Sequence, residues 1–167
     1  IHTLLEALEI CRRRGLRLRL LVVGPFESDE VVAQIKRSSI ETHLVGAVQD
    51  TRPYLQVMDI HCLPTQREGF PNVVLEAAAM GLATIASDAT GSVDAVVDGE
   101  TGLVFRNKDP NGLAAALTVL APKPALRRQL GDQARSFVSA NFARESIWRL
   151  QEQNMDRHVS SPDQKLR

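Results

Sequence analysis

Apolar residues recur along this chain in alternating stretches of helical and extended spacing. In the first fourteen residues, Ile1, Leu4, Leu8 and Cys11 lie three or four positions apart, as on one face of a helix. Short apolar runs bounded by turn residues are typical of buried strands. The pattern predicts helices over 1–14, 28–38, 52–58, 72–80, 109–120, 125–140 and 143–158, and strands over 17–23, 43–48, 59–63, 83–87 and 101–105.

Strands that alternate with helices imply crossover connections and a parallel sheet. We therefore expect an α/β fold, with a doubly wound parallel sheet and helices on both faces. Ligands bind such sheets at the carboxyl ends of the strands. Gly24, Val48, Glu68 and the turn near Gly91 each follow a predicted strand, so the pattern places them all along that edge.

Composition narrows the class of protein. A chain of 167 residues with 44% hydrophobic content fits one globular domain, which we place at 1–158, followed by a polar tail at 159–167. The formal net charge is zero, so bulk electrostatics predict no nucleic-acid partner. Cys11 and Cys62 lie in apolar segments, which favours two buried, reduced thiols over a disulfide or a metal site.

The segment from Glu68 to Glu76 carries the clearest chemistry. The first carboxylate stands in a Gly/Pro loop, and the second lies about one turn inside the predicted helix. We expect both to point into one cleft at the helix start, where free backbone N–H groups favour anions. Carboxylates beside an anion site suit a ligand that carries both hydroxyls and phosphates, such as a nucleotide sugar.

At this segment the chain resembles the retaining glycosyltransferases of family 4. Their E-x7-E signature reads here Glu68-Gly69-Phe70-Pro71-Asn72, followed by Glu76-Ala77-Ala78-Ala79-Met80-Gly81. The resemblance continues through 83–88, 91–94 and 97–104. It implies the carboxy-terminal, Rossmann-like donor-binding half of a GT-B fold.

The resemblance also implies roles for single residues. Glu76 would hold the ribose, where the plain alternative is a solvated helix residue. Glu68 would be catalytic and lie near the donor sugar, where the alternative is a loop residue that caps the helix. Backbone amides of the turn from Gly69 to Val73 would cradle the diphosphate, with donors from Phe70, Asn72 and Val73, because Pro71 has no N–H. Pro71 itself suits the first helical position.

Four further positions are less specific. In the family, the turn at Gly24 faces the nucleotide and the residue at Val48 flanks the base, although an ordinary turn and ordinary packing explain both equally well. Asp94 stands where many members have Glu, within Gly91-Ser92-Val93-Asp94. It either preserves a contact or caps the next helical turn. His61 lies in an apolar strand and is expected to be a satisfied core residue.

The expected function is transfer of a hexose from a nucleotide diphosphate sugar, UDP- or GDP-linked, to an acceptor, with retention of configuration. The family resemblance places the enzyme in bacterial polysaccharide or glycolipid synthesis, in the cytoplasm or at the inner face of the cell membrane. It implies no metal and no cofactor. The alternatives are a non-catalytic nucleotide-sugar-binding module and another GT-B enzyme, such as an epimerase.

The beginning of the chain leads to a last expectation. The apolar stripe is already formed at Ile1, so we expect a piece cut from a longer protein. The missing part would hold the acceptor-binding domain, the cations that neutralise the diphosphate, and the first strand of the sheet. The loss of that strand would leave a gap or an exposed edge. The piece alone would be inactive.

Overall fold

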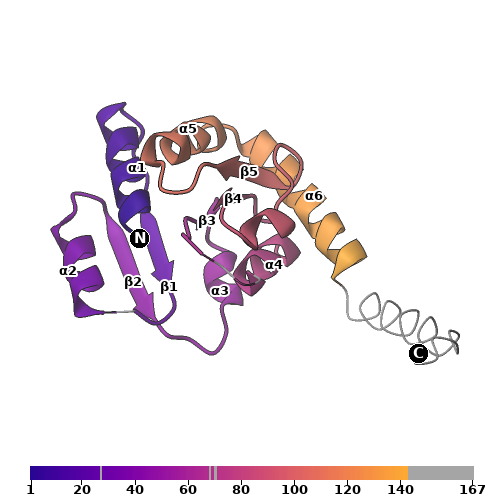
Figure 1. Ribbon diagram of the computed structural model, residues 1–167, viewed down its shortest axis with the longest axis horizontal. Helices are drawn as coiled ribbons and strands as arrows, with labels where there is room; N and C mark the ends of the chain where they lie inside the picture. The colour runs from indigo at the N-terminus through magenta and orange to yellow at the C-terminus, as the bar shows by residue number, and fades with distance from the viewer. Residues whose placement is uncertain (27, 68, 70, 143–167) are drawn as a thin grey trace, which may run out of the picture.

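The computed structural model describes residues 1–26, 28–67, 69 and 71–142. Helices alternate with strands along this part of the chain (Figure 1). In chain order the elements are α1 (His2–Arg13), β1 (Leu20–Val23), α2 (Asp29–Arg37), β2 (Thr42–Gly46), α3 (Arg52–Leu55), β3 (His61–Leu63), α4 (Asn72–Ala79), β4 (Thr84–Ser87), the 3₁₀ turn η1 (Ser92–Asp94), β5 (Gly102–Phe105), α5 (Pro110–Leu120) and α6 (Pro124–Asn141).

Each helix and strand predicted within the described residues is present, although several are shorter than predicted. The strand expected over 17–23 begins at Leu20, because its pairing with β2 starts at the Leu20–Thr42 pair. The helix expected over 52–58 ends at Leu55. The helix predicted over 143–158 and the tail at 159–167 lie outside the described residues.

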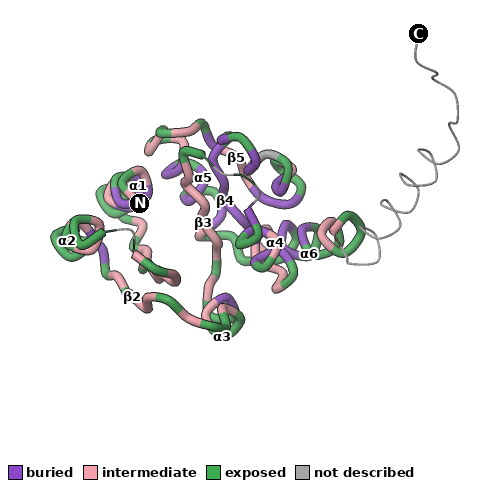
Figure 2. The backbone as a smooth tube through the Cα atoms, turned by 60° about the horizontal axis from the view of Figure 1, so that its bottom comes forward, coloured by how far each residue is buried: buried purple, intermediate pink, exposed green. Residues whose placement is uncertain are grey.

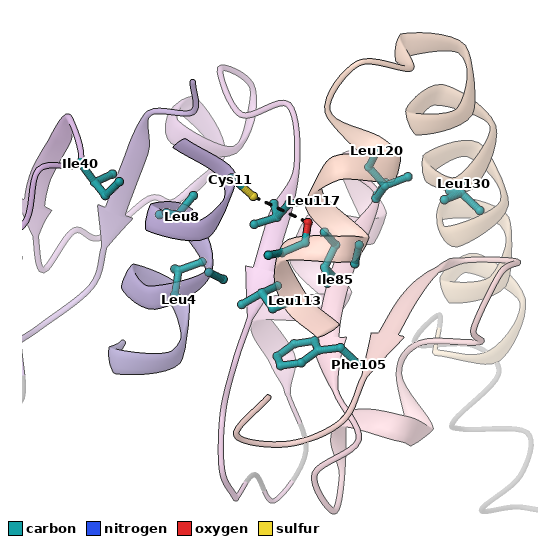
Figure 3. Packing of buried hydrophobic residues seen from close by; sticks show 14 residues of the cluster. Leu4, Leu8, Cys11, Ile40, Ile85, Phe105, Leu113, Leu117, Leu120 and Leu130 are labelled. Carbon is teal, nitrogen blue, oxygen red and sulfur yellow. Dashed lines mark hydrogen bonds between the residues drawn. The ribbon is translucent and has the colours of Figure 1, made fainter. Parts of the chain in front are cut away.

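Helices cover both faces of the sheet, as the doubly wound pattern predicts. The central strand β4 is buried throughout, and its successive side chains point to opposite faces. Ile85 packs into a cluster with side chains from α1 and α5, which lie side by side in Figure 1. Figure 3 shows this cluster, with Leu113 and Leu117 of α5 opposite Leu4 and Leu8 of α1. Ala86 packs on the other face, against Val74 of α4.

The strands form two separate parallel sheets, so the structure has the gap expected from the loss of a strand in place of the single continuous sheet that the pattern alone predicts. One sheet pairs β1 with β2, and the other has the order β3-β4-β5. All residues of β1 and β3 are only half-buried, in contrast to β4, and Figure 2 shows the difference for β3 and β4. A cavity of about 930 Å³, lined by residues of both β1 and β3, lies between the two sheets.

Candidate functional site

The start of α4 presents unshared backbone donors. Pro71 is the residue that precedes the first helical residue, so the sequence prediction placed it one position too far into the helix. The Pro71 carbonyl accepts a hydrogen bond from the Val74 N–H at 2.9 Å. Among the described residues, no side chain caps this helix start. The N–H groups of Asn72 and Val73 are therefore available in the first turn, where the helix dipole favours an anion.

Glu76 lies one turn into α4, on the face of the helix that lines the cavity. Its neighbours Val74 and Ala77 are buried, whereas Glu76 and Val73 are exposed and both line the cavity wall. The helical period separates these two pairs because residues three or four apart share a face. The Glu76 carboxylate therefore faces the part of this cavity at the carboxyl edge of the strands, which Thr51 and Val73 also line.

Thr51 contacts this carboxylate from a different element. Its Oγ1 donates a hydrogen bond to Glu76 Oε2 at 2.9 Å, and its side chain also lines the cavity. Sequence reasoning missed Thr51, which belongs to none of the motif blocks. The available signal was the position of Thr51 in the chain. It directly precedes α3, in the segment that follows β2, and segments that follow the strands lie at the carboxyl edge of the sheet.

The loop that leads from β3 towards α4 is fastened at its base. The Ser87 hydroxyl, buried at the end of β4, donates to the Thr65 carbonyl at 2.6 Å. The Asn107 amide donates to the Gln66 carbonyl at 3.0 Å. Glu68 and Phe70, predicted to be the catalytic residue and an amide donor, lie outside the described residues, so their roles stay predictions. Gly69 is exposed, with open space around its Cα.

The far end of α4 is fixed by α6. Arg135 donates from Nε to the Ala79 carbonyl at 3.2 Å and from Nη2 to the Met80 carbonyl at 3.0 Å. These are last-turn carbonyls of α4, where a cation also meets the favourable end of the helix dipole. Gly131 of α6 lies directly against the backbone of Gly81. The position of Glu76 is therefore determined by packing at both ends of its helix.

Gly24 and Val48 lie beyond the carboxyl ends of their strands, as predicted. Gly24 follows β1 with φ of 127°, a conformation that L-residues rarely adopt, and its N–H donates to the Gly46 carbonyl at 2.8 Å. Val48 follows β2 and is half-buried. Neither residue lines the cavity beside Glu76. Their proposed contacts with a nucleotide stay predictions.

Burial dominates the titration of the groups on β3. Burial lowers the pKa of His61 to about 4, and its Nδ1 lies 3.2 Å from Thr84 Oγ1. Burial raises the pKa of the Cys62 thiol to about 12. Cys11 is buried as predicted, but Cys62 is only half-buried because β3 borders the cavity. Both cysteines are free thiols.

The turn after β4 places Gly91 and Ser92 in the interior and Asp94 at the surface. Among the described residues, Ser92 Oγ is a buried side-chain oxygen without a hydrogen-bond partner. No three His, Cys, Asp or Glu side chains in the described ranges are grouped closely enough to hold a metal ion. Within the same ranges, no helix has the length and apolar content to cross a membrane.

Fold and site together define a parallel α/β domain with a carboxylate and a free helix start at the carboxyl edge of its strands. The family model described as glycosyl transferases group 1 matches residues 1–122. The chain therefore belongs to the group 1 glycosyltransferases.

Two kinds of relatives agree with this assignment. The capsular polysaccharide biosynthesis glycosyltransferase CapM of Staphylococcus aureus is 30% identical over 152 residues, which cover 89% of this chain and 40% of CapM. Among solved structures, HepE of Anabaena in complex with UDP has a TM-score of 0.82 at 20% identity, over 93% of this chain and 44% of HepE. Sucrose-phosphate synthase of Thermosynechococcus elongatus has a TM-score of 0.77 at 28% identity, over 95% of this chain and 43% of that one.

These comparisons confirm the expected fold, which corresponds to the carboxy-terminal half of a GT-B glycosyltransferase. They also show that the chain spans less than half the length of each of these three relatives.

Proposed function

We propose that this chain is the donor-binding domain of a retaining glycosyltransferase of family 4. The whole protein would transfer a hexose from a UDP- or GDP-linked donor to a polysaccharide or glycolipid precursor at the cytoplasmic face of the membrane. The observation that carries the proposal is the Glu76 carboxylate, which faces the cavity one turn beyond a helix start that no described side chain caps.

The spacing of these two features fits the chemistry of a nucleoside diphosphate. One helical turn rises about 5.4 Å, so the Glu76 carboxylate and the first-turn amides can reach a ribose and its attached phosphates together. A carboxylate has two acceptor oxygens, which suits the vicinal hydroxyls of a ribose. The amides of Asn72 and Val73 offer donors to phosphate oxygens. In this proposal, the charge of the diphosphate requires no metal ion and no cofactor.

The catalytic role falls to Glu68, in the loop before α4. A carboxylate beside the anomeric carbon would stabilise the positive charge that develops there as the leaving diphosphate departs. Such a group acts mainly in the transition state, so its loss should lower kcat more than nucleotide affinity.

The rest of the protein would complete the domain as well as the acceptor site. The Leu20 N–H donates to the Glu41 carbonyl, just before β2, and the Gly24 N–H donates to the Gly46 carbonyl, so Leu21 and Val23 direct their backbone groups away from β2, towards the cavity. Cys62 of β3 does the same from the other side, because His61 N donates to Ala83. We infer that a strand from the rest of the full-length protein fills the part of this cavity between β1 and β3 and joins the two sheets, while the part lined by Thr51, Val73 and Glu76, at the carboxyl edge of the strands, stays open for the nucleotide.

The test is calorimetric binding of UDP and GDP to the full-length protein. Glu76→Gln should weaken the binding of whichever of UDP and GDP binds more tightly by roughly 1–3 kcal/mol, as expected for hydrogen bonds to a charged group. Glu41→Gln is the matched control, because Glu41 lines the same cavity at the amino end of β2. Glu68→Ala should bind nearly as before but lose turnover. Unchanged binding in Glu76→Gln would remove Glu76 from the nucleotide site and refute the proposal.

A further inference from the structure

Thr51 is held firmly at the start of α3, between two residues that form an ion pair. Asp50 Oδ1 accepts hydrogen bonds from the Arg52 backbone N–H at 3.0 Å and from Arg52 Nε at 2.9 Å. Asp50 Oδ2 accepts a third from Arg52 Nη2 at 2.9 Å. One turn later, Leu55 is buried and anchors the helix. The Thr51 carbonyl accepts from the Leu55 N–H at 3.1 Å, so the backbone is restrained on both sides of Thr51.

Glu76, by contrast, has an exposed side chain with three rotatable bonds before its carboxylate. Among the described residues, one hydrogen bond limits its conformation, the bond from Thr51 Oγ1 to Oε2 at 2.9 Å. An ionised carboxylate offers about four lone-pair positions, so this bond leaves Oε1 and part of Oε2 free to accept from a ligand. The Thr51 hydroxyl thus fixes the carboxylate without using up its acceptor capacity.

We propose that Thr51 is a positioning residue, which orients the Glu76 carboxylate towards the ribose hydroxyls and so sets the preference of the site for ribonucleotides. The inference rests on the proposed function of Glu76. Its physical basis is pre-organisation: a side chain that is already held in the binding rotamer loses less conformational freedom when the ligand arrives.

The experiment compares two pairs of ligands on the full-length protein by calorimetry. The probes are UDP and GDP, each beside its 2′,3′-dideoxy analogue, which lacks both hydroxyls. The pair whose parent nucleotide binds more tightly is used. Thr51→Val keeps the branched shape and removes the hydroxyl, and Thr51→Ser keeps the hydroxyl. Thr42→Val is the control, because Thr42 lines the same cavity and its hydroxyl bonds only the nearby Ile40 carbonyl among the described residues.

Thr51→Val should weaken the binding of the ribonucleotide about three- to tenfold, which is the cost of ordering one flexible side chain. It should leave the affinity for the dideoxy analogue unchanged. The ratio of the affinity for the ribonucleotide to the affinity for the dideoxy analogue should therefore fall. Thr51→Ser should restore it, and Thr42→Val should not alter it. In a Glu76→Gln background, Thr51→Val should have little further effect, since the group that it positions has lost its charge.

The alternative is that Thr51 only ties α3 to α4. Thr51→Val would then lower the melting temperature and weaken both ligands equally, with an unchanged ratio, and this result would overturn the inference. If Glu76→Gln narrows the ratio while Thr51→Val does not, the inference fails and the proposed function stands. If Glu76→Gln leaves the ratio unchanged, the proposed function fails and the inference fails with it.

Discussion

The close contact between Gly131 of α6 and the backbone of Gly81 leaves no room for a side chain at position 131. Gly131 lies inside α6, where replacement of Gly by Ala ordinarily stabilises a helix by about 0.5–1 kcal/mol. A Cβ at this position, however, would collide with the Gly81 carbonyl oxygen and lie 2.7 Å from its carbonyl carbon and 3.4 Å from Ala83 N. These are backbone atoms, so no change of rotamer can relieve the contact. Accommodation requires that α6 move away from α4.

We expect Gly131→Ala to lower the free energy of unfolding by about 2 kcal/mol. Overpacking of a tight contact costs about 1–3 kcal/mol, from which the gain in helix propensity is subtracted. Displacement of α6 also stretches the bonds from Arg135 to the end of α4, and hydrogen bonds from a charged donor contribute about 1.5–3 kcal/mol each when intact. The Arg135 side chain can partly adjust to the displacement of α6, so we expect only part of this hydrogen-bond energy to be lost.

The assay is urea denaturation of the protein followed by circular dichroism, with Gly112→Ala as the matched control. Gly112 is the helical glycine of α5, and a Cβ there would meet Asp109 Oδ2 at 2.7 Å, the end of a side chain that can rotate. The gain in propensity then offsets a weakened cap, so the control should be about neutral. Stability of Gly131→Ala at or above that of the control would refute the close-packing argument.

Two further predictions concern the strands beside the cavity. Since burial lowers the pKa of His61 from 6.5 to about 4, the unfolded chain takes up a proton first as the pH falls. Stability should be complete above about pH 6.5 and decline towards pH 4, with a loss of up to about 2 kcal/mol between pH 7.5 and 5 in urea denaturation. His61→Gln should flatten this dependence. Hydrogen exchange on the full-length protein should show protected amides at Leu21 and Cys62, and rapid exchange at both would exclude a strand between β1 and β3.

Much of the secondary structure was predictable because its signals are local. Asp109-Pro110 marks the start of α5, and in the structure the Asp109 carboxylate accepts from the Asn111 N–H at 3.0 Å. Ser28 caps α2 in the same way, through the Val31 N–H at 3.3 Å. Capping involves residues two or three positions apart, so it can be read from the sequence directly.

The candidate site was predictable only in part. The place of Glu76 in the first turns of α4 followed from the Gly/Pro loop and the helical pattern. The contact with Thr51 did not, because it joins residues 25 positions apart in the sequence, and no local pattern encodes such a contact. The division of the sheet was expected from family resemblance alone. Strand order depends on long-range pairing, and apolar periodicity gives only the number and direction of the strands.

The charge around the cavity indicates what the site must receive from elsewhere. A nucleoside diphosphate carries roughly two or more negative charges, whereas a helix start supplies about half a unit charge. Arg127 lines the cavity, but its guanidinium donates to Asp59 Oδ1 at 3.1 Å and to the Leu120 and Ala121 carbonyls at the end of α5. Arg17 and Arg19 line the opposite end, before β1 begins. Glu76 and the amides of α4 can therefore orient a nucleotide, but the charge of its phosphates requires cationic side chains from outside the described cavity wall.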